Sequence, residues 1–321
     1  MVSGPSVVSV VVPAFNAEGS IGKCIDSIKS QDHQNLEIIV VDDGSTDGTF
    51  EIASQLSSTD PRVRVIRSAE NVGVHKARAL GLSHSCGGLI GFVDADDYIE
   101  SQMYSTLLKA IERTGASIAI CSASLISQGN RIGRRIDVRS SKHVRRDILL
   151  KFSRMKFGSG VLWNKLYVRD VIEEPALLDS KLEMGEDYVV NFGAFARAST
   201  VVLCRQELYN YVVHSSNASG QNGWPALAQL LRSYAVCLEI YLPSQEHLAP
   251  FINELYIKQL HFPIYRIPGE RPSEEITQNI AESFRRILAV NPSSIYSLLH
   301  AVPLWNEKIR RVLNYAYGPG L

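Results

Sequence analysis

The stretch that most constrains the fold lies at residues 37–49, which read EIIVVDDGSTDGT. Four β-branched residues at 38–41 run directly into two adjacent carboxylates and a glycine-containing turn. A continuous apolar run of this kind predicts a strand that is buried on both faces, as in a parallel sheet covered by helices. Open α/β sheets bind ligands at the carboxyl ends of their strands, where Asp42 and Asp43 would lie. Because neighbouring carboxylates repel each other, their pairing favours a binding function over a purely structural one.

Strand and helix patterns alternate through the first part of the chain. Short apolar runs predict strands, and apolar residues spaced three and four apart predict helices between them. The predicted strands lie at 7–12, 38–41, 63–66, 89–93 and 117–121, and the predicted helices at 21–28, 50–56, 74–85 and 104–111. Such alternation predicts right-handed βαβ units around a mostly parallel sheet. The glycine fingerprint of nicotinamide dehydrogenases is absent, which disfavours that class.

A second acidic cluster, Asp94-Ala95-Asp96-Asp97, follows the predicted strand at 89–93. Carboxylate oxygens are the ligands that Mg²⁺ and Mn²⁺ prefer, and these ions commonly use one or two of them together with phosphate oxygens. The alternative is a set of acids at a helix start, where negative charge is also favoured. Two acidic strand ends in one sheet are much rarer than one, so the sequence favours the metal interpretation.

These residues complete an ordered set of motifs. The set is Pro13-Ala14-Phe15-Asn16, the 41–49 stretch, Asn71-Val72-Gly73 with Ala77-Arg78, the 94–97 cluster, 163–167 (WNKLY) and 185–187 (GED). The chain resembles the inverting glycosyltransferases of family 2, and the later motifs resemble the bacterial branch that builds capsular, exopolysaccharide and O-antigen chains. The resemblance is strong over 7–100 and extends to about Tyr211. It implies a GT-A fold, a Rossmann-like mostly parallel sheet flanked by helices, in a catalytic domain at 1–222 with a helical C-terminal region at 223–321.

The resemblance implies a role for each donor-side residue. Pro13, Ala14 and Phe15 would lie beside the nucleobase, Asp43 with Asp42 would bind the base edge and ribose, Arg78 would support the diphosphate, and Asp94 would contact ribose or sugar. Asp96 would hold Mn²⁺ or Mg²⁺. His214 is a second candidate for the metal or diphosphate, although a lone histidine is more often structural or on the surface.

The acceptor side is implied by the 185–187 motif. Asp187 resembles the catalytic base that takes the proton from an acceptor hydroxyl, and it would also suit the start of the apolar helix that follows. The remaining candidates for sugar or acceptor contacts are Asp97, Trp163, Asn164, Lys165 and Glu186. For Trp163 a place in the buried core is an equally good interpretation.

Charge and cysteine content exclude several classes of partner. Lys+Arg and Asp+Glu balance at 33 each, so nothing indicates nucleic acid or another polyanion as a partner. The five cysteines are scattered and form no CxxC pair, which suits reduced thiols in the cytoplasm. No apolar stretch reaches the roughly 18 residues of a membrane span, so we expect any membrane contact to be peripheral, at the inner face.

For two regions the sequence allows more than one interpretation. The basic stretch at 128–146 is either a solvated loop or a cationic rim for an anionic substrate or lipid head group. In the 223–321 region, aromatic and basic side chains could hold a glycan or lipid-linked acceptor or rest on a membrane; a helical cap or a homodimer interface is the alternative. The aromatic residues are Tyr241, Phe251, Tyr256, Phe262 and Tyr265, and the basic ones are Lys258, Arg266, Arg271, Arg285 and Arg286.

The sequence therefore predicts a metal-dependent inverting transferase that uses a nucleoside-diphosphate sugar, most simply a UDP-sugar. A nucleotidyltransferase shares this architecture, but 13–20 lacks the glycine-rich basic loop that such an enzyme has after its first strand. A catalytically inactive module that binds a nucleotide sugar is the other alternative, and the retention of all the acids disfavours it.

Overall fold

The computed structural model describes residues 7–136, 138, 141–157, 160–172, 182, 184–214, 223–265 and 272–294. Contacts divide the chain into two compact units. The first comprises Met1–Ile148, Phe157–Glu174 and Gly193–His214, and the second Leu149–Lys156, Pro175–Phe192 and Ser215–Leu321. The predicted boundary at residue 222 lies outside the described residues and stays a prediction. The segment that carries Glu186 and Asp187 belongs with the C-terminal helices.

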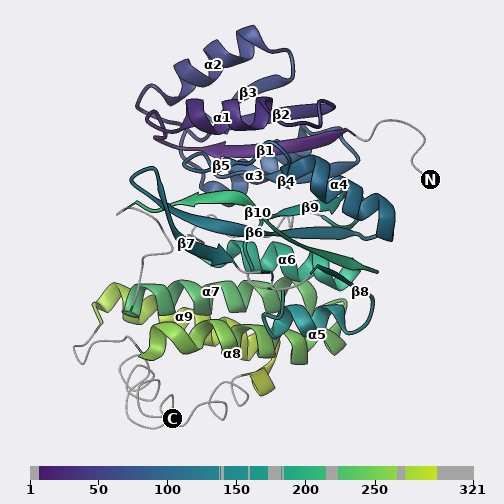
Figure 1. The fold of residues 1–321 in the computed structure, drawn as a ribbon. Helices are drawn as coiled ribbons and strands as arrows, with labels where there is room; N and C mark the ends of the chain where they lie inside the picture. The colour runs from purple at the N-terminus through teal and green to yellow at the C-terminus, as the bar shows by residue number, and fades with distance from the viewer. Residues whose placement is uncertain are drawn as a thin grey trace. The chain divides into compact units, whose positions relative to one another are not determined.

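The first unit is built on a ten-stranded sheet (Figure 1). Its first four long strands pair in parallel in the order β3-β2-β1-β4, as the alternating pattern predicts. They are β1 (Val8–Ala14), β2 (Leu36–Asp42), β3 (Val63–Arg67) and β4 (Leu89–Phe92). The carboxyl ends of β2 and β4 therefore lie on either side of the end of β1.

The rest of the sheet is mixed. β9 (Lys165–Val168) lies antiparallel between β4 and β6 (Ile118–Ser127), and β10 (Val201–Val212) runs parallel to β6. The short strands β5 (Tyr98–Ile99), β7 (Asn130–Ile136) and β8 (Lys142–Val144) add antiparallel pairs. The predicted strand at 117–121 is confirmed as the start of β6. The sequence did not predict that β9 separates it from β4.

Helices cover both faces of the parallel half. They are α1 (Ile21–Lys29), α2 (Thr49–Thr59), α3 (Val74–Ser83) and α4 (Met103–Thr114), which confirms the four predicted helices. Successive side chains of a strand point to opposite faces. Ile38 and Val40 therefore join the core cluster of α1, α2 and α4, whereas Ile39 and Val41 pack on Ala77 of α3. This explains why the 38–41 run is apolar at every position.

The second unit is helical. It contains most of α5 (Ile148–Ser153), the start of α6 (Glu186–Arg197), α7 (Gly223–Tyr241), α8 (Ala249–Tyr265) and α9 (Glu274–Val290). α8 and α9 both pack on α7. The predicted apolar stripe of α7 is confirmed, because Leu227, Leu230, Leu231, Tyr234 and Leu238 are all buried. None of the described helices is both long and apolar enough to cross a membrane.

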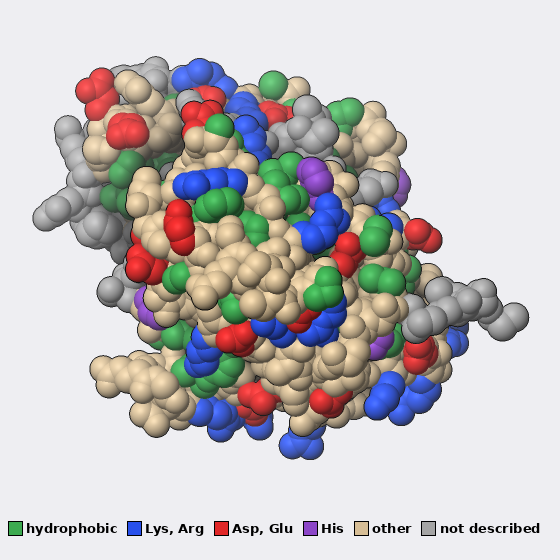
Figure 2. Space-filling model, turned by 90° about the horizontal axis from the view of Figure 1, so that it is seen from above, with side chains coloured by type: hydrophobic (Ala, Val, Ile, Leu, Met, Phe, Trp, Pro, Cys, Tyr) green, Lys and Arg blue, Asp and Glu red, His purple; other side chains and the backbone are tan. Residues whose placement is uncertain are grey.

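Charged side chains of both signs are interspersed on the face seen in Figure 2. Lys and Arg alternate there with Asp and Glu, and no single-sign field covers that face. Within the basic 128–146 stretch, Arg131 and Arg134 both bind the carboxylate of Glu207, at 2.5 and 2.6 Å, which offsets part of their charge. For those two arginines the structure supports the interpretation of an ordinary solvated surface.

Candidate active site

Hydrogen bonds join the turn after β2 to the loop before α3. Asp43 is 3% exposed, and its two oxygens accept the backbone N–H groups of Val72 and Gly73, both at 2.9 Å. Gly44 has a φ of +72°, and a Cβ there would lie 2.7 Å from the carbonyl carbon of Glu70. Both the left-handed backbone and the close approach require glycine. The carboxylate of Asp43 therefore organises the loop that leads into α3.

Asp42, the last residue of β2, has a different environment. It is fully buried, and no described group donates a hydrogen bond of good geometry to either of its oxygens. Its counter-charge is Arg67, whose Nε lies 3.1 Å from Oδ2. Arg67 is itself half exposed and stacks on the ring of Phe50 at 4.3 Å. The two carboxylate oxygens of Asp42 can therefore still accept hydrogen bonds at this strand end.

The loop after β1 borders the same edge. Asn16 adopts a φ of +47°, and its Oδ1 accepts the N–H of Thr46 at 2.9 Å, which ties this loop to the turn after β2. Pro13 lies buried in β1, whereas Phe15 is 46% exposed. An exposed aromatic ring beside two acidic strand ends is a flat apolar surface of the kind on which a base can stack.

Residues 94–97, which we call the 94–97 turn, connect β4 to β5. The ends of β2 and β4 flank β1, and strands are spaced by about 4.8 Å, so the two acidic strand ends lie roughly 10 Å apart. Arg78, a buried residue of α3, donates to Oδ1 of Asp94 at 2.8 Å. The structure therefore brings together the predicted residues Arg78 and Asp94, from different elements.

Negative charge in the 94–97 turn is only partly neutralised. Burial and the Asp94 carboxylate raise the pKa of Asp96 from 3.8 to about 6, while the charges of His214 and Arg78 oppose that rise. His214 is exposed, and its effect on the pKa of Asp96 shows that the two side chains lie close enough to interact. Burial, Asp96 and Asp94 also raise the pKa of Asp97 well above its usual range.

Asp97 faces inward. Its Oδ2 accepts from the hydroxyl of Tyr209 and its Oδ1 from the N–H of Val212, both at 2.7 Å. It is 2% exposed, so in this conformation it holds the turn to β10 and does not present its oxygens to a sugar. The expectation that Asp97 orients the acceptor or a metal-bound water stays a prediction.

Tyr209 is a residue of this site that the sequence did not predict. Its buried hydroxyl donates to Asp97 and accepts the N–H of Asp94 at 3.2 Å. Its ring stacks on Trp163 with centroids 4.2 Å apart. The sequence showed only an aromatic strand, since nothing in a local pattern reveals which distant loop a tyrosine hydroxyl will reach.

The 163–165 motif is buried too. Trp163 is 3% exposed between Tyr209 and Tyr211, so the core interpretation holds for it. Asn164 and Lys165 are fully buried; Asn164 donates to the carbonyl of Cys121 at 2.7 Å and accepts from Lys165 at 2.8 Å. In this structure the three side chains pack and form hydrogen bonds within the protein, and their expected sugar or acceptor contacts stay predictions.

Glu186 and Asp187 begin α6 in the second unit. The preceding residue, Gly185, has a φ of +92°, and its carbonyl accepts from the hydroxyl of Ser233 in α7 at 2.7 Å. One turn into α6, the carbonyl of Val189 accepts from Tyr241 at 2.9 Å. Glu186 is buried and Asp187 half-buried. The start of α6 is therefore held rigidly by α7.

The aromatic and basic residues expected to form an acceptor surface are mostly engaged elsewhere. Tyr241 and Tyr256 are buried, and Arg286 binds Glu239 through two hydrogen bonds of 2.8 and 2.6 Å. For these three the structure favours the helical-cap interpretation. Arg266 and Arg271, and the side chains of Phe262 and Tyr265, lie outside the described residues.

A divalent cation fits the donor set of the 94–97 turn. Within the described part of the chain no three His, Cys, Asp or Glu side chains form a complete metal site. Mg²⁺ and Mn²⁺ at nucleotide sites use one or two protein carboxylates, with substrate phosphates filling the shell. Asp96 matches that requirement, because burial and the Asp94 carboxylate raise its pKa and His214 lies close enough to interact with it.

Acidic turns follow the two strands that flank β1, in a mostly parallel sheet covered by helices, and this arrangement resembles the GT-A fold of glycosyltransferases. The family model for glycosyl transferase family 2 matches residues 9–174, and the chain belongs to that family. It is 29% identical to the Bacillus subtilis protein named uncharacterized glycosyltransferase EpsJ, over 313 residues that cover 95% of this chain and 89% of EpsJ. The predicted family and enzyme class are thereby confirmed.

Solved structures show the same fold. Staphylococcus aureus TarS 1–349 in complex with UDP-GlcNAc superposes with a TM-score of 0.74 at 19% identity, covering 96% of this chain and 89% of that one. The mannosyltransferase PcManGT from Pyrobaculum calidifontis, in complex with GDP-Man and Mn²⁺, gives a TM-score of 0.55 at 15% identity, with coverage of 98% and 84%. At these identities the likeness concerns the fold alone.

Proposed function

We propose that this enzyme moves a sugar from a UDP-sugar to a hydroxyl of a glycan or lipid-linked glycan, with inversion at the anomeric carbon. The observation that carries the proposal is the pairing of Arg78 with Asp94 beside a charged, poorly neutralised Asp96. The UDP-GlcNAc complex of TarS supports the choice of donor. The family's bacterial polysaccharide branch supports the choice of acceptor.

The donor would lie across the carboxyl ends of β1, β2 and β4. Phe15 offers its exposed ring to the base, and Pro13 shapes the strand end beneath it. Asp42 and Asp43 supply carboxylates for base and ribose, Asp42 having the greater free hydrogen-bonding capacity. Arg78 can turn part of its guanidinium toward the diphosphate while Asp94 orients it, since charge-assisted bonds of this kind are directional.

A divalent cation would be held by Asp96, with His214 as a second ligand. The ion supplies charge that offsets the negative charge developing on the leaving diphosphate. The protein's own contribution is to keep Asp96 in place, because the 94–97 turn is fastened to β10 through Asp97 and Tyr209. Mn²⁺ in the PcManGT complex supports this choice of ion class.

Asp187 is proposed as the general base. Direct displacement with inversion requires one carboxylate on the acceptor side to receive the hydroxyl proton, which contributes roughly 10²–10⁴-fold. Support comes from the 185–187 motif and from the rigid start of α6. Glu186 beside it is buried and would support that position. The second unit would then serve the acceptor, at a glycan or at the inner face of the membrane, in the cytoplasm.

The test is a panel of UDP-, GDP- and dTDP-sugars with Mn²⁺, scored first by thermal shift. A ligand present at 100 times its dissociation constant adds about 2.7 kcal/mol to the free energy of unfolding. Turnover is then followed as released nucleoside diphosphate. Release of UDP from a UDP-sugar supports the proposal, whereas pyrophosphate formation from UTP and a sugar phosphate would establish a nucleotidyltransferase.

Asp187→Asn separates the base from a binding role. The variant keeps the shape of the side chain but cannot take the proton. We expect unchanged donor affinity and a rate at least about 100-fold lower. A near-normal rate with weakened donor binding would assign Asp187 to binding. Binding of UDP-sugar without hydrolysis or transfer by the parent protein would indicate the inactive module.

A further inference from the structure

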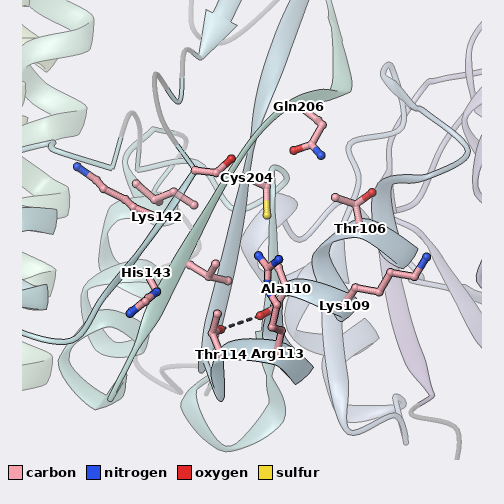
Figure 3. Close-up of a pocket in the computed structure, with 12 residues that line it drawn as sticks. Thr106, Lys109, Ala110, Arg113, Thr114, Lys142, His143, Cys204 and Gln206 are labelled. Atoms are coloured by element: carbon pink, nitrogen blue, oxygen red, sulfur yellow. Dashed lines mark hydrogen bonds between the residues drawn. The ribbon is translucent and has the colours of Figure 1, made fainter.

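A pocket of about 420 Å³ opens in the first unit between α4, β8 and the start of β10 (Figure 3). On α4, Thr106, Lys109 and Arg113 recur every third or fourth residue, which places them on one helical face. β8 contributes Lys142 and His143. The functional proposal above uses none of these residues.

The basic side chains that line this pocket have no acidic partner among the residues that the structure describes. No Asp or Glu is among the described residues that line it. Lys109, Arg113, Lys142 and His143 form no ion pair with any described residue, in contrast to Arg131 and Arg134 nearby in sequence. These side chains are exposed to solvent, and a concave wall that carries basic groups raises the local concentration of anions.

The floor of the pocket is partly apolar. Arg113 points from α4 toward Cys204 on β10 (Figure 3). Burial raises the pKa of the Cys204 thiol, and the Arg113 guanidinium opposes that rise, so the cation lies close to the floor. Hydroxyl groups of Thr106 and Ser141 add neutral donors at the wall. Charged basic groups and neutral hydroxyl groups are both hydrogen-bond donors, and together they suit a tetrahedral or planar oxyanion.

The pocket is remote from the donor site. Val202, Leu203 and Cys204 line it at the start of β10, whereas Tyr209 and Val212 contact the 94–97 turn near the end of that strand. β10 is irregular between Cys204 and Tyr209, so the separation is measured along its partner β6. There the partners of Leu203 and Val212 are Ile120 and Ile126, six residues apart, which corresponds to roughly 20 Å at about 3.3 Å per residue. The diphosphate of a donor at the 94–97 turn therefore does not account for the unpartnered cations.

We propose that this pocket binds a phosphate or carboxylate group carried by the acceptor glycan, at a distance from the point of transfer. The proposal rests on the glycosyl-transfer function above. A polymer can span roughly 20 Å, whereas a single sugar cannot. A membrane surface fits less well, because interfacial sites use apolar or aromatic anchors, and the exposed large apolar residues Phe15, Ile132, Val213 and Leu288 do not line the pocket.

The experiment titrates the full chain with inorganic phosphate and, separately, with a glucuronate-containing tetrasaccharide. Backbone amide shifts in a TROSY spectrum locate the binding. We expect shifts at Arg113, Lys142 and His143 with both probes, and none there with a neutral N-acetylglucosamine tetrasaccharide. Shifts confined to the 94–97 turn and the end of β2 would overturn the proposal.

Charge reversal provides the matched comparison. Arg113→Glu combined with Lys142→Glu should weaken the binding of both anionic probes at least 10-fold. Arg205→Glu changes an exposed cation of the same strand that does not line the pocket, and it should stay within about twofold of the parent. Equal effects of the two variants would reduce the result to general surface charge and overturn the site.

Two further measurements separate this inference from its alternatives. UDP binding and UDP-sugar hydrolysis should be unchanged in the double variant. If the parent protein itself neither binds UDP nor hydrolyses a UDP-sugar, that result counts against the proposed function alone. Should the reversal unfold the protein, Arg113→Gln and Lys142→Gln replace it, with a weakening of about threefold or more expected. Phosphatidylglycerol vesicles that bind the parent and not the double variant, without oligosaccharide binding, would assign the pocket to a membrane and overturn the glycan proposal.

Discussion

At the scale of single residues, the 94–97 turn holds more negative charge than its surroundings neutralise. Arg78 compensates Asp94, while the half-buried Asp96 and the buried Asp97 beside it have raised pKa values. A carboxylate that folding disfavours in its charged form lowers the stability of the empty protein. Such a loss of stability is expected for a site whose carboxylates are arranged to hold a cation.

Asp96→Asn should therefore stabilise the protein in the presence of a chelator. The pKa of Asp96 rises from 3.8 to about 6 on folding, so the folded state holds the proton more tightly and stability falls as pH rises between those values. We expect equal melting temperatures for parent and variant near pH 4. Above pH 6 the variant should be more stable, by at most about 3 kcal/mol at 1.36 kcal/mol per unit.

Thermal melts across pH 4–8 measure this difference. A variant that is less stable than the parent at pH 7.5 would contradict the assignment of unneutralised charge to Asp96. The same variant should lose metal-dependent turnover. Full activity of Asp96→Asn with the chelator present would remove Asp96 from the proposed metal site.

Tyr209→Phe tests how the 94–97 turn is held. The change removes a hydroxyl that serves Asp97 and Asp94 and keeps the ring that stacks on Trp163. An unsatisfied buried partner costs about 1–3 kcal/mol. We expect a loss of stability of that size, and kcat/KM lower by about 10-fold with the larger part in kcat.

Tyr104→Phe is the matched control. Tyr104 is equally buried, but its hydroxyl has no hydrogen-bond partner among the described residues. The control should be neutral or stabilising, with normal kinetics. If Tyr209→Phe proves as silent as the control, the hydroxyl does not position the turn.

At the scale of elements, the start of α6 depends on its contact with α7. Gly185 combines a φ of +92° with a Cβ position only 2.8 Å from Cβ of Ser233. The short distance is to a side chain fixed in a helix by hydrogen bonds to Gly185 and Tyr256. Any side chain at 185 must move α6 away from α7, and Asp187 with it.

Gly185→Ala should accordingly destabilise the protein and reduce transfer. We expect a loss of about 2–4 kcal/mol, which combines backbone strain with overpacking. Gly115→Ala is the control, because Gly115 has a φ of +65° and open space around its Cβ position. It should lose about 1 kcal/mol and no activity. Urea unfolding and transfer assays measure both, and equal losses would show that the contact with Ser233 is unimportant.

At the scale of the whole molecule, the 185–189 segment belongs to the same compact unit as the helices that follow residue 222. Residues on both sides of residue 222 belong to one helical unit. In that unit, side chains of α7 donate hydrogen bonds to the carbonyl groups of Gly185 and Val189. Those bonds close contacts between segments some 50 residues apart in sequence. A cut at residue 222 therefore removes the partner that holds the 185–189 segment.

Truncation after residue 222 should expose the apolar surface that α7 covers. We expect the shortened protein to aggregate or to melt well below the parent, as seen by size-exclusion chromatography and calorimetry. A shortened protein that stays folded, hydrolyses donor slowly and loses transfer would instead assign the helices to the acceptor alone. Full transfer by it would contradict any role of the helices at the site.

The sequence by itself determined the parallel half of the fold and the acids at its edge. Strand and helix periods are local, so the 38–41 run, the four helices and the acidic turns after β2 and β4 could be predicted without tertiary information. The family followed from the order of those motifs. The predicted residues Arg78 and Asp94 meet in the structure because both belong to this half.

Only the tertiary structure decided which polar residues remain available to a ligand. The sequence suggests Asp97, Asn164 and Lys165 as site residues, but all three are buried, and Asp97 and Asn164 bond to Tyr209 and Cys121, which are distant in sequence. Tyr209 became part of the site for the same reason, since its hydroxyl reaches a loop 112 residues away. Hydrogen bonds between distant segments leave no periodic trace, so neither the insertion of β9 nor the contact between Gly185 and α7 could be predicted from the sequence.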